Sequence, residues 1–230
     1  MSYFPINVDI RKRPCTVIGG GRVALRKVKG LLDCGAAVTL ISPAATSALA
    51  EMAGQGRITW HERGYRQGDL AGSFMVIAAT DDETVQEQVH AEAEEGNLLL
   101  NVADVPKWCN FILPATVRQG DLAISISTAG KSPALAKRLR QELEKSFGPE
   151  YDLALELMGT LRPVVLAKGL PHSKNKIIFE DLLHPDLIPL LKKGDWQTIT
   201  NHIHAVLGAD VDLGCLDTFR HNLQQNSEGK

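Results

Sequence analysis

The first half of the chain alternates two kinds of hydrophobic pattern. Short runs of β-branched and apolar residues predict strands, and apolar residues at helical spacing predict helices. The predicted strands are Cys15–Ile18, Ala37–Ile41, Arg57–His61, Phe74–Ala79 and Leu98–Val102, and the predicted helices are Arg22–Leu32, Ala45–Met52 and Glu83–Glu95. Because strands and helices alternate through short connections, we expect a parallel sheet with helices on both faces.

The pattern changes around Lys107. Phe111–Val117 and Leu122–Ser127 predict two antiparallel strands, joined by a turn at Arg118–Asp121. Ser132 and Pro133 then begin a helix that continues through Ala134–Lys145, because serine can cap free amides and proline suits the first helical position.

The remainder of the chain is predicted to be mostly helical from Tyr151 onward. Breaks are expected near Gly169–Pro171 and at Gly194, and the tail Gln224–Lys230 is expected to fray.

The stretch from Thr16 to Ala24 carries the first sign of chemistry. Its pattern Gly19-x-Gly21-x-x-Ala24 follows a predicted strand and opens a predicted helix. Gly19 permits the tight turn, Gly21 lets the backbone approach a pyrophosphate, and Ala24 lets the helix pack closely on the sheet. The pattern predicts a dinucleotide site at the helix N-terminus.

The predicted fold class is therefore α/β. A Rossmann-type parallel-sheet domain is expected at residues 1–112, a small α+β region at 113–148 and a helical C-terminal domain at 149–230.

Composition and charge exclude several function classes. The net charge of −2 gives no reason to expect nucleic acid as a partner. No apolar run reaches membrane-spanning length, and Met1–Asp9 lacks the features of a signal peptide. The four cysteines, Cys15, Cys34, Cys109 and Cys215, have no spacing suited to zinc and are expected to be small packing groups. We expect a soluble, cytoplasmic protein with no membrane partner.

The choice of nucleotide is less well marked. An NAD-preferring site usually carries an acidic residue after the second strand. Here Ser42, Pro43 and Ala44 follow that strand, and the next acid is Glu51. Because no arginine stands there to bind a 2′-phosphate, the sequence favours NAD over NADP.

Asp104 follows the last predicted strand of the sheet. Ligands of open α/β sheets gather beyond the carboxyl ends of the strands, so this aspartate could face a nicotinamide. An aspartate followed by Pro106 can equally be a turn or helix-capping residue.

Three stretches in order, Asn101–Lys107, Asn110–Ala115 and Ile126–Ala136, add a resemblance. Phe4–Ile6 and Ala78–Asp82 match as well. The chain is similar over about residues 1–150 to the precorrin-2 dehydrogenase and sirohydrochlorin ferrochelatase family, which also forms the N-terminal module of siroheme synthase.

The resemblance implies a homodimer that binds NAD, with the elements after Lys107 interlocking the protomers. It implies oxidation of precorrin-2 to sirohydrochlorin, and in many members insertion of ferrous iron or cobalt to give siroheme. Methylation by the further module of fused siroheme synthases is not expected. The residues expected to bind the cofactor are Gly19, Gly21, Arg22, Val23, Ser42, Pro43, Ala44, Thr80 and Val102.

The key aspartate of the family falls on Asp104, which becomes the expected catalytic residue. An aspartate with the ordinary pKa of about 3.9 is ionised at neutral pH and can accept the proton that dehydrogenation releases. The same carboxylate could guide a ferrous ion transiently, but no permanent metal site is expected. His202 and His204 would lie on different helical faces and are expected to be solvated or packed.

A substrate rich in carboxylates needs cations and free amides. Lys107, Thr128, Lys131 and Ser132 are the expected substrate-binding residues, the last two at a helix start. Lys137 and Arg140 fit the solvated face of that helix better. Some relatives carry a phosphorylated serine where Thr128 stands. Whether this chain is regulated by phosphorylation at Thr128 is left open.

Two other functions remain compatible with the sequence. A non-catalytic NAD-sensing module would need the glycine turn but not the polar Asp104 and Ser132 clusters. A tetrapyrrole carrier or pure chelatase would have lost the nucleotide site. Some relatives also act as dehydrogenases without chelatase activity.

Overall fold

The computed structural model describes residues 3–184, 186–216 and 218–219, so the predicted frayed tail Gln224–Lys230 lies outside the described residues. The chain forms two compact units, Met1–Leu113 and Pro114–Lys230, which are described separately below. Among the described residues, every helix is too short or too polar to span a membrane.

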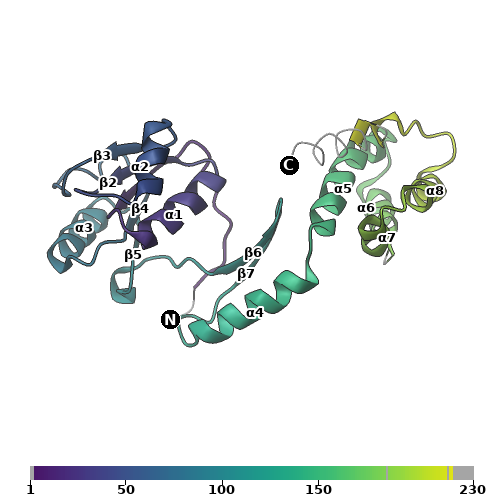
Figure 1. Ribbon diagram of the computed structural model, residues 1–230. Helices are drawn as coiled ribbons and strands as arrows, with labels where there is room; N and C mark the ends of the chain where they lie inside the picture. Colours follow the sequence, from purple (N-terminus) through teal and green to yellow (C-terminus); the bar gives the residue numbers. More distant parts are fainter. Residues whose placement is uncertain (1–2, 185, 217, 220–230) are drawn as a thin grey trace. The chain divides into compact units, whose positions relative to one another are not determined.

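The first unit is built on a parallel five-stranded sheet in the order β3-β2-β1-β4-β5 (Figure 1). Its strands are β1 (Pro14–Ile18), β2 (Ala37–Ile41), β3 (Thr59–His61), β4 (Met75–Ala78) and β5 (Leu99–Val102). This order places the crossover point between β1 and β4, where a crevice forms at the carboxyl ends of the strands. The predicted Rossmann-type sheet is confirmed.

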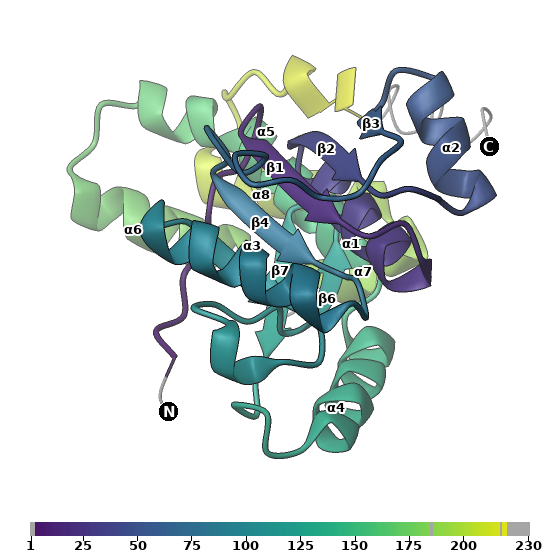
Figure 2. The same cartoon turned by 90° about the vertical axis from the view of Figure 1, so that its left-hand side faces the viewer.

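Helices cover both faces of this sheet, as the pattern predicts. α1 (Arg22–Asp33) and α2 (Ser47–Gly54) lie on one face and α3 (Glu83–Glu95) lies on the other (Figure 2). Because both faces are covered, the central strands are apolar at consecutive positions, and β4 is buried throughout. α2 begins two residues later than expected, since Thr46 donates its amide to the Gly20 carbonyl at 2.9 Å.

The free edge of β5 is covered by the segment 109–111. The Asn110 side chain accepts a hydrogen bond from the Leu100 amide at 2.8 Å and donates one to the Leu98 carbonyl at 2.7 Å. Cys109 Sγ accepts from the Val102 amide at 3.2 Å and donates to the Val102 carbonyl at 3.3 Å. We call Cys109 and Asn110 the edge bracket, because these two side chains bond where a further strand would bond.

The second unit begins with an antiparallel hairpin, β6 (Ala115–Gln119) and β7 (Leu122–Ile126), followed by α4 (Pro133–Ser146). The predicted start of the first strand at Phe111 is wrong. The Phe111 carbonyl accepts from the Asn101 side chain of the first unit's sheet region at 3.1 Å, and Pro114 has no amide to donate to a ladder. Within this unit α4 packs on the hairpin.

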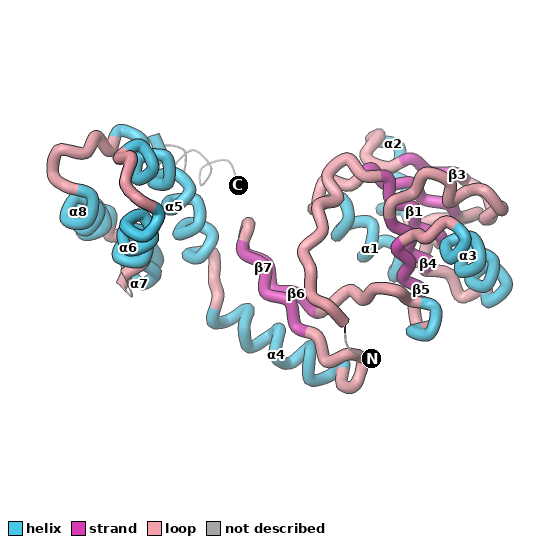
Figure 3. The backbone as a smooth tube through the Cα atoms, turned by 180° about the vertical axis from the view of Figure 1, so that it is seen from behind, coloured by secondary structure: helices cyan, strands magenta, loops and turns pink. Residues whose placement is uncertain are grey.

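The second unit continues with the helices α5 (Glu150–Ala167), α6 (His172–Leu182), α7 (Leu187–Lys193) and α8 (Trp196–Leu207) (Figure 3). Their core includes Leu157, Leu161, Ile199 and Ile203, each 1 % exposed. The predicted breaks at Gly169 and Gly194 are confirmed, and both glycines have positive φ. The sequence did not predict the further break between α6 and α7.

Candidate active site

The turn Gly19–Gly21, here called the glycine cradle, joins β1 to α1. Gly19 has φ +105°, and a Cβ there would lie 2.4 Å from the Ala79 carbonyl oxygen. A Cβ at Gly20 would lie 2.0 Å from the Ala44 carbonyl oxygen. The turns after β2 and β4 therefore press directly against the cradle. The sequence prediction gave Gly20 no role, although its position between Gly19 and Gly21 could have indicated a place without room for a side chain.

Gly21 is glycine for a different reason. Among the described residues beyond its chain neighbours, no atom would lie within 4 Å of a Cβ at this position, so the cradle is open here. Gly21 is the N-cap of α1 and no side chain caps that helix, whereas Asp82 caps α3 and Ser132 caps α4. The first amides of α1 are therefore available to an external acceptor. An open glycine beside free helix amides fits the pyrophosphate of a dinucleotide.

The turn after β2 presents backbone to the cradle. Ser42 is 6 % exposed, and its hydroxyl donates to the Ala44 carbonyl at 2.7 Å. Trp60 Nε1 donates to the Ser42 carbonyl at 3.0 Å. Because the Ser42 hydroxyl already donates its proton to a carbonyl of the same turn, a ribose would contact mainly the backbone and the exposed residues Pro43 and Ala44.

The turn after β4 is fixed by a buried glutamine. Gln86 is 5 % exposed, and its side-chain amide donates to the Thr80 carbonyl at 2.6 Å. The Thr80 hydroxyl accepts from the Asp82 amide at 3.3 Å. Since Ala79 is the residue that crowds Gly19, Gln86 helps to set the wall of the cradle. The sequence did not identify Gln86.

Asp104 stands at the end of β5, on the same edge of the sheet as the cradle. The Ala103 amide donates to the Ala78 carbonyl at 2.8 Å, which ties this turn to the end of β4. Asp104 is exposed and has φ +62°, a left-handed conformation that aspartate tolerates better than most residues. Strained backbone of this kind concentrates at functional sites.

The helix-capping interpretation of Asp104 is wrong. Val105 is the N-cap of the short helix η1 (Pro106–Trp108), and no side chain caps that helix. In the part of the chain that the structure describes, the Asp104 carboxylate makes no hydrogen bond and no ion pair within 4.0 Å. The side chain is therefore available for chemistry.

Next to Asp104, η1 carries Lys107 and Trp108. The Lys107 ammonium lies 4.7 Å from the centroid of the Trp108 ring, and His90 of α3 stacks on that ring at 5.4 Å. A cation over an aromatic face is attracted by the ring quadrupole. The predicted substrate-binding lysine thus already has an aromatic partner that holds it near the Asp104 turn.

Lys27 of α1 is a titratable group that sequence reasoning missed. It is half-buried, whereas the neighbouring Arg26 and Lys29 are exposed. Burial and the charge of Arg26 lower the pKa of the Lys27 ammonium, while Asp104 and Cys109 act in the opposite direction. The sequence could have indicated this burial, because Lys27 lies within one helical turn of the apolar residues Ala24, Val28 and Leu31.

The other predicted substrate residues lie in the second unit, in the loop before α4. The Thr128 hydroxyl accepts from the Ser132 amide at 3.2 Å, and the Ser132 hydroxyl accepts from the Leu135 amide at 3.2 Å. Ala129 has φ +50°, which is strained for a residue with a Cβ. Lys131 is exposed. Because Ser132 caps the helix and Pro133 has no amide, fewer free amides remain than the sequence suggested.

The basic side chains of α4 form a solvated helix face. Arg138 pairs with Glu142 at 2.8 Å, and Arg140 pairs with Glu144, each one turn further along. Lys137 is exposed. This arrangement agrees with the interpretation of these cations as surface residues.

The described residues contain no group of three or more side chains that could hold a metal ion. His202 bonds to the Asp181 carbonyl at 2.9 Å, His204 lies 3.4 Å from the Gly208 carbonyl, and the buried Ile203 separates them on the helix.

Cys15 is 1 % exposed, and burial raises the pKa of its thiol to about 11. It is a packing group, as predicted.

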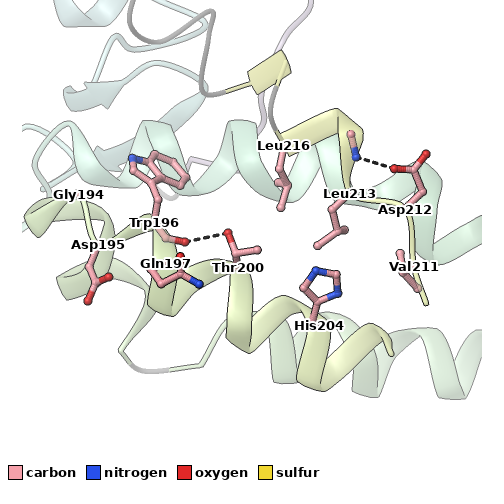
Figure 4. A pocket seen from close by; sticks show the side chains of 11 residues that line it. Gly194, Asp195, Trp196, Gln197, Thr200, His204, Val211, Asp212, Leu213 and Leu216 are labelled. Carbon is pink, nitrogen blue, oxygen red and sulfur yellow. Dashed lines mark hydrogen bonds between the residues drawn. The ribbon is translucent and has the colours of Figure 1, made fainter. Parts of the chain in front are cut away.

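A pocket of about 650 Å³ lies in the second unit between α8 and residues 211–216 (Figure 4). Its polar groups are used locally: Thr200 donates to the Trp196 carbonyl at 2.8 Å, and Asp212 accepts from the Gly214 amide at 2.8 Å. None of the predicted site residues lines it. No sequence motif pointed to this pocket.

Comparison with known families defines the class of protein. Residues 6–115 match the family described as "putative NAD(P)-binding", and residues 119–146 match "sirohaem biosynthesis protein central". The glycine cradle, the strand order and the first match together define a dinucleotide-binding Rossmann protein. The second match adds a similarity to sirohaem biosynthesis proteins over residues 119–146.

Curated relatives agree with this assignment. The siroheme synthase of Pseudoalteromonas atlantica is 35 % identical over 195 residues, which are 85 % of this chain and 42 % of that protein. The siroheme synthase of Methylobacillus flagellatus is 32 % identical over 230 residues, which are 100 % of this chain and 45 % of that protein. The chain thus spans less than half the length of these relatives.

A solved structure shares the fold. "SirC, precorrin-2 dehydrogenase" superposes with a TM-score of 0.73 at 24 % identity, over 86 % of this chain and 100 % of that chain. The predicted α/β fold with a helical C-terminal region is confirmed.

Proposed function

We propose that the chain is an NAD-dependent dehydrogenase that oxidises precorrin-2 to sirohydrochlorin. The observation that carries the proposal is the shared sheet edge: the open Gly21 amide face and the unpaired Asp104 carboxylate both stand at carboxyl ends of strands in one unit. The similarity to siroheme synthases and to a precorrin-2 dehydrogenase supports the choice of substrate.

The residues of the chain divide the work as follows. NAD, when bound, accepts the hydride that leaves the tetrapyrrole. Gly21, Arg22 and Val23 would hold the pyrophosphate through the start of α1, with Gly19 shaping the turn. Ser42, Pro43 and Ala44 would meet the ribose, and Thr80 and Val102 would line the crevice. Asp104 would accept the proton released as the substrate carbon loses its hydride.

The test is the production of NADH. Purified protein, NAD and precorrin-2 are expected to give NADH and sirohydrochlorin, and Asp104→Asn is expected to lower that rate at least tenfold while NAD still binds. If the wild-type protein gave no NADH in this assay, the proposed dehydrogenase activity would be refuted. Calorimetric titration with NAD separates the alternatives: a pure chelatase or carrier would not bind it, and a sensing module would bind it without turnover.

We further propose that the chain inserts ferrous iron into sirohydrochlorin, with cobalt as an alternative substrate metal. Metal insertion expels two pyrrole protons, and the same unpaired Asp104 carboxylate could take one of them. Ferrous iron added to sirohydrochlorin is expected to react faster with the protein than without it, and Asp104→Asn is expected to lose that excess. Equal rates with and without protein would refute the ferrochelatase activity, and only the dehydrogenase activity would remain proposed.

We also propose a homodimer formed through β6, β7 and α4. Within the described residues, each strand of the hairpin has one neighbour and therefore one unpaired edge. Only Ala136 of α4 is buried, and Leu135 is 48 % exposed. Unpaired edges and an uncovered apolar helix face favour association with a second copy. Light scattering after size-exclusion chromatography is expected to give twice the chain mass.

Lys107, Thr128, Lys131 and Ser132 are proposed to bind carboxylates of the tetrapyrrole. Lys131→Ala is expected to raise the KM for precorrin-2 several-fold without changing the affinity for NAD. An unchanged KM would remove Lys131 from the substrate site. We also propose a cytoplasmic location, which fractionation of cells would check.

A further inference from the structure

The lysine of η1 is folded back onto the aromatic ring of its chain neighbour. Lys107 Nζ lies 4.7 Å from the centroid of the Trp108 ring. Side chains of consecutive helical residues do not face one another, so the lysine stem has to turn back over the indole to make this contact. The attraction between an ammonium and the face of an indole favours that conformation over those in which the lysine meets only water.

The Trp108 ring is itself fixed by its surroundings. It is half-buried and packs against the apolar cluster that includes Val89 and Ala93 of α3. His90 of the same helix stacks on the indole, with 5.4 Å between ring centroids and 19° between ring planes. Because a neighbouring helix holds the ring in place, the ring gives the Lys107 ammonium a defined position.

Hydrogen bonds tie η1 to the turn that carries Asp104. The Trp108 amide donates to the Val105 carbonyl at 3.1 Å, and the Cys109 thiol donates to the same carbonyl at 3.5 Å. Val105 directly follows Asp104, so the proposed catalytic carboxylate and the Lys107 ammonium belong to one locally bonded segment. The position of the ammonium is thereby coupled to the turn at which the reaction is proposed to occur.

The Lys107 ammonium keeps its capacity to bind a ligand. Lys107 is exposed, and within the part of the chain that the structure describes it forms no ion pair. An ammonium has three N–H donors, and contact with a ring face leaves donors for a carboxylate. Because the ring already limits the rotamers of the lysine, binding a carboxylate costs less conformational entropy than it would at a freely moving lysine.

We infer that Trp108 is a positioning residue for the tetrapyrrole: its ring, backed by His90, holds the Lys107 ammonium where a substrate carboxylate binds beside the Asp104 turn. The inference rests on the proposed function, because that function supplies a substrate rich in carboxylates. Trp108 acts through Lys107, so its removal weakens substrate binding and leaves the affinity for NAD and the chemical step in place.

The first experiment compares Trp108→Leu, which keeps an apolar side chain, with Trp108→Phe, which keeps an aromatic face. In the whole chain, Trp108→Leu is expected to raise the KM for precorrin-2 about threefold to fivefold, with kcat and the NAD dissociation constant changed less than twofold. Trp108→Phe is expected to recover most of the wild-type KM. A KM in Trp108→Leu within twofold of wild type overturns the inference, as does a loss confined to kcat.

A double-mutant cycle shows whether the ring acts through the lysine. Lys107→Met is expected to raise the KM for precorrin-2 about tenfold, and adding Trp108→Leu to that variant is expected to raise it less than twofold further. Lys29→Met, which removes an exposed lysine of α1, is the matched control and is expected to leave the KM unchanged. Effects that multiply in the double variant overturn the inference, because Trp108 would then contact the substrate without Lys107.

The contact itself is tested by NMR of protein with labelled lysine, without any turnover. The ring current of Trp108 is expected to shift the Lys107 Hε signals upfield of those of Lys29, and Trp108→Leu is expected to abolish that shift. Lys107→Met assigns the signals. Wild-type Lys107 signals without the shift overturn the inference.

Binding of sirohydrochlorin separates the inference from the proposed function. Its dissociation constant, followed by the absorbance of the tetrapyrrole, is expected to rise about threefold to fivefold in Trp108→Leu. That rise in a protein that makes no NADH supports the inference and refutes the dehydrogenase. NADH production with the same dissociation constant in both proteins overturns the inference and leaves the dehydrogenase in place. A wild-type protein that neither makes NADH nor binds sirohydrochlorin refutes both.

Discussion

Replacing Gly21 with alanine tests whether a ligand, rather than the fold, requires glycine in the cradle. A Cβ at Gly21 would meet no atom of the described residues within 4 Å beyond its chain neighbours, and the φ of −81° and ψ of −171° at this position suit any residue. Alanine is a poorer N-cap than glycine by some tenths of a kcal/mol, and it restricts the unfolded chain by about 0.4–1 kcal/mol in compensation. We expect the free energy of unfolding to change by less than about 1 kcal/mol.

The effect on NAD should be larger. The added methyl group would stand between the start of α1 and the pyrophosphate and would weaken at least one amide–phosphate hydrogen bond. Hydrogen bonds to charged groups contribute about 1.5–3 kcal/mol, so the NAD dissociation constant should rise about tenfold to a hundredfold.

Gly20→Ala is the matched comparison, because there the protein itself excludes the methyl group. Its Cβ would lie 2.0 Å from the Ala44 carbonyl oxygen and 2.8 Å from the Ala45 Cα. Relieving these contacts moves backbone by about 1 Å and weakens the bond from the Thr46 amide to the Gly20 carbonyl. Overpacking and a lost hydrogen bond together should cost about 2–4 kcal/mol.

The assay combines urea unfolding for stability with calorimetric titration for NAD. Wild type, Gly21→Ala and Gly20→Ala are compared in one buffer. Wild-type NAD affinity in Gly21→Ala would refute the placement of the pyrophosphate. Wild-type stability in Gly20→Ala would refute the contact between the turns.

Three further predictions concern stability and are measured by urea unfolding. Ala129→Gly should raise the free energy of unfolding by about 1 kcal/mol, because it relieves a φ of +50°; a loss would contradict that strain. Ser132→Ala should lower the free energy of unfolding by about 1 kcal/mol, because it removes the hydroxyl that caps the Leu135 amide. Ser132→Thr keeps a hydroxyl and should retain most of that stability. The Arg63 guanidinium lowers the pKa of Asp69 from its ordinary value, so Arg63→Met should lower the free energy of unfolding at neutral pH. That difference should shrink as pH falls below about 4, since the stabilisation belongs to the ionised carboxylate; a difference independent of pH would exclude this pair as its source.

The sheet domain was predictable because its signals are local. Apolar runs of strand length mark β1, β2 and β4, and α3 begins and ends where the sequence predicts, at Glu83 and Glu95. The start of β6 was not predictable in the same way. Phe111 looks like a strand residue, but its carbonyl accepts a hydrogen bond from the Asn101 side chain, a tertiary contact that periodicity does not encode.

The site was predictable where function needs a special backbone, and less so where one side chain supports another. The glycine pattern and the position of Asp104 after a strand both follow from the chain order of a Rossmann sheet. Gln86 is an ordinary helix residue in the sequence. Its role comes from the Thr80 carbonyl in the turn before α3, which accepts a hydrogen bond from its side chain.

The edge bracket ties the limit of the sheet to its chemistry. β1, β2 and β4 each lie between two strands, whose many backbone groups no single mutation removes. At β5 the boundary consists of the Asn110 side chain, the Cys109 thiol and the bond from the Asn110 amide to the Leu100 carbonyl, and the same thiol bonds to the turn that carries Asp104. A substitution at Cys109 would therefore remove bonds at the strand edge and at the Asp104 turn together, so this edge of the sheet cannot be altered there without altering the turn.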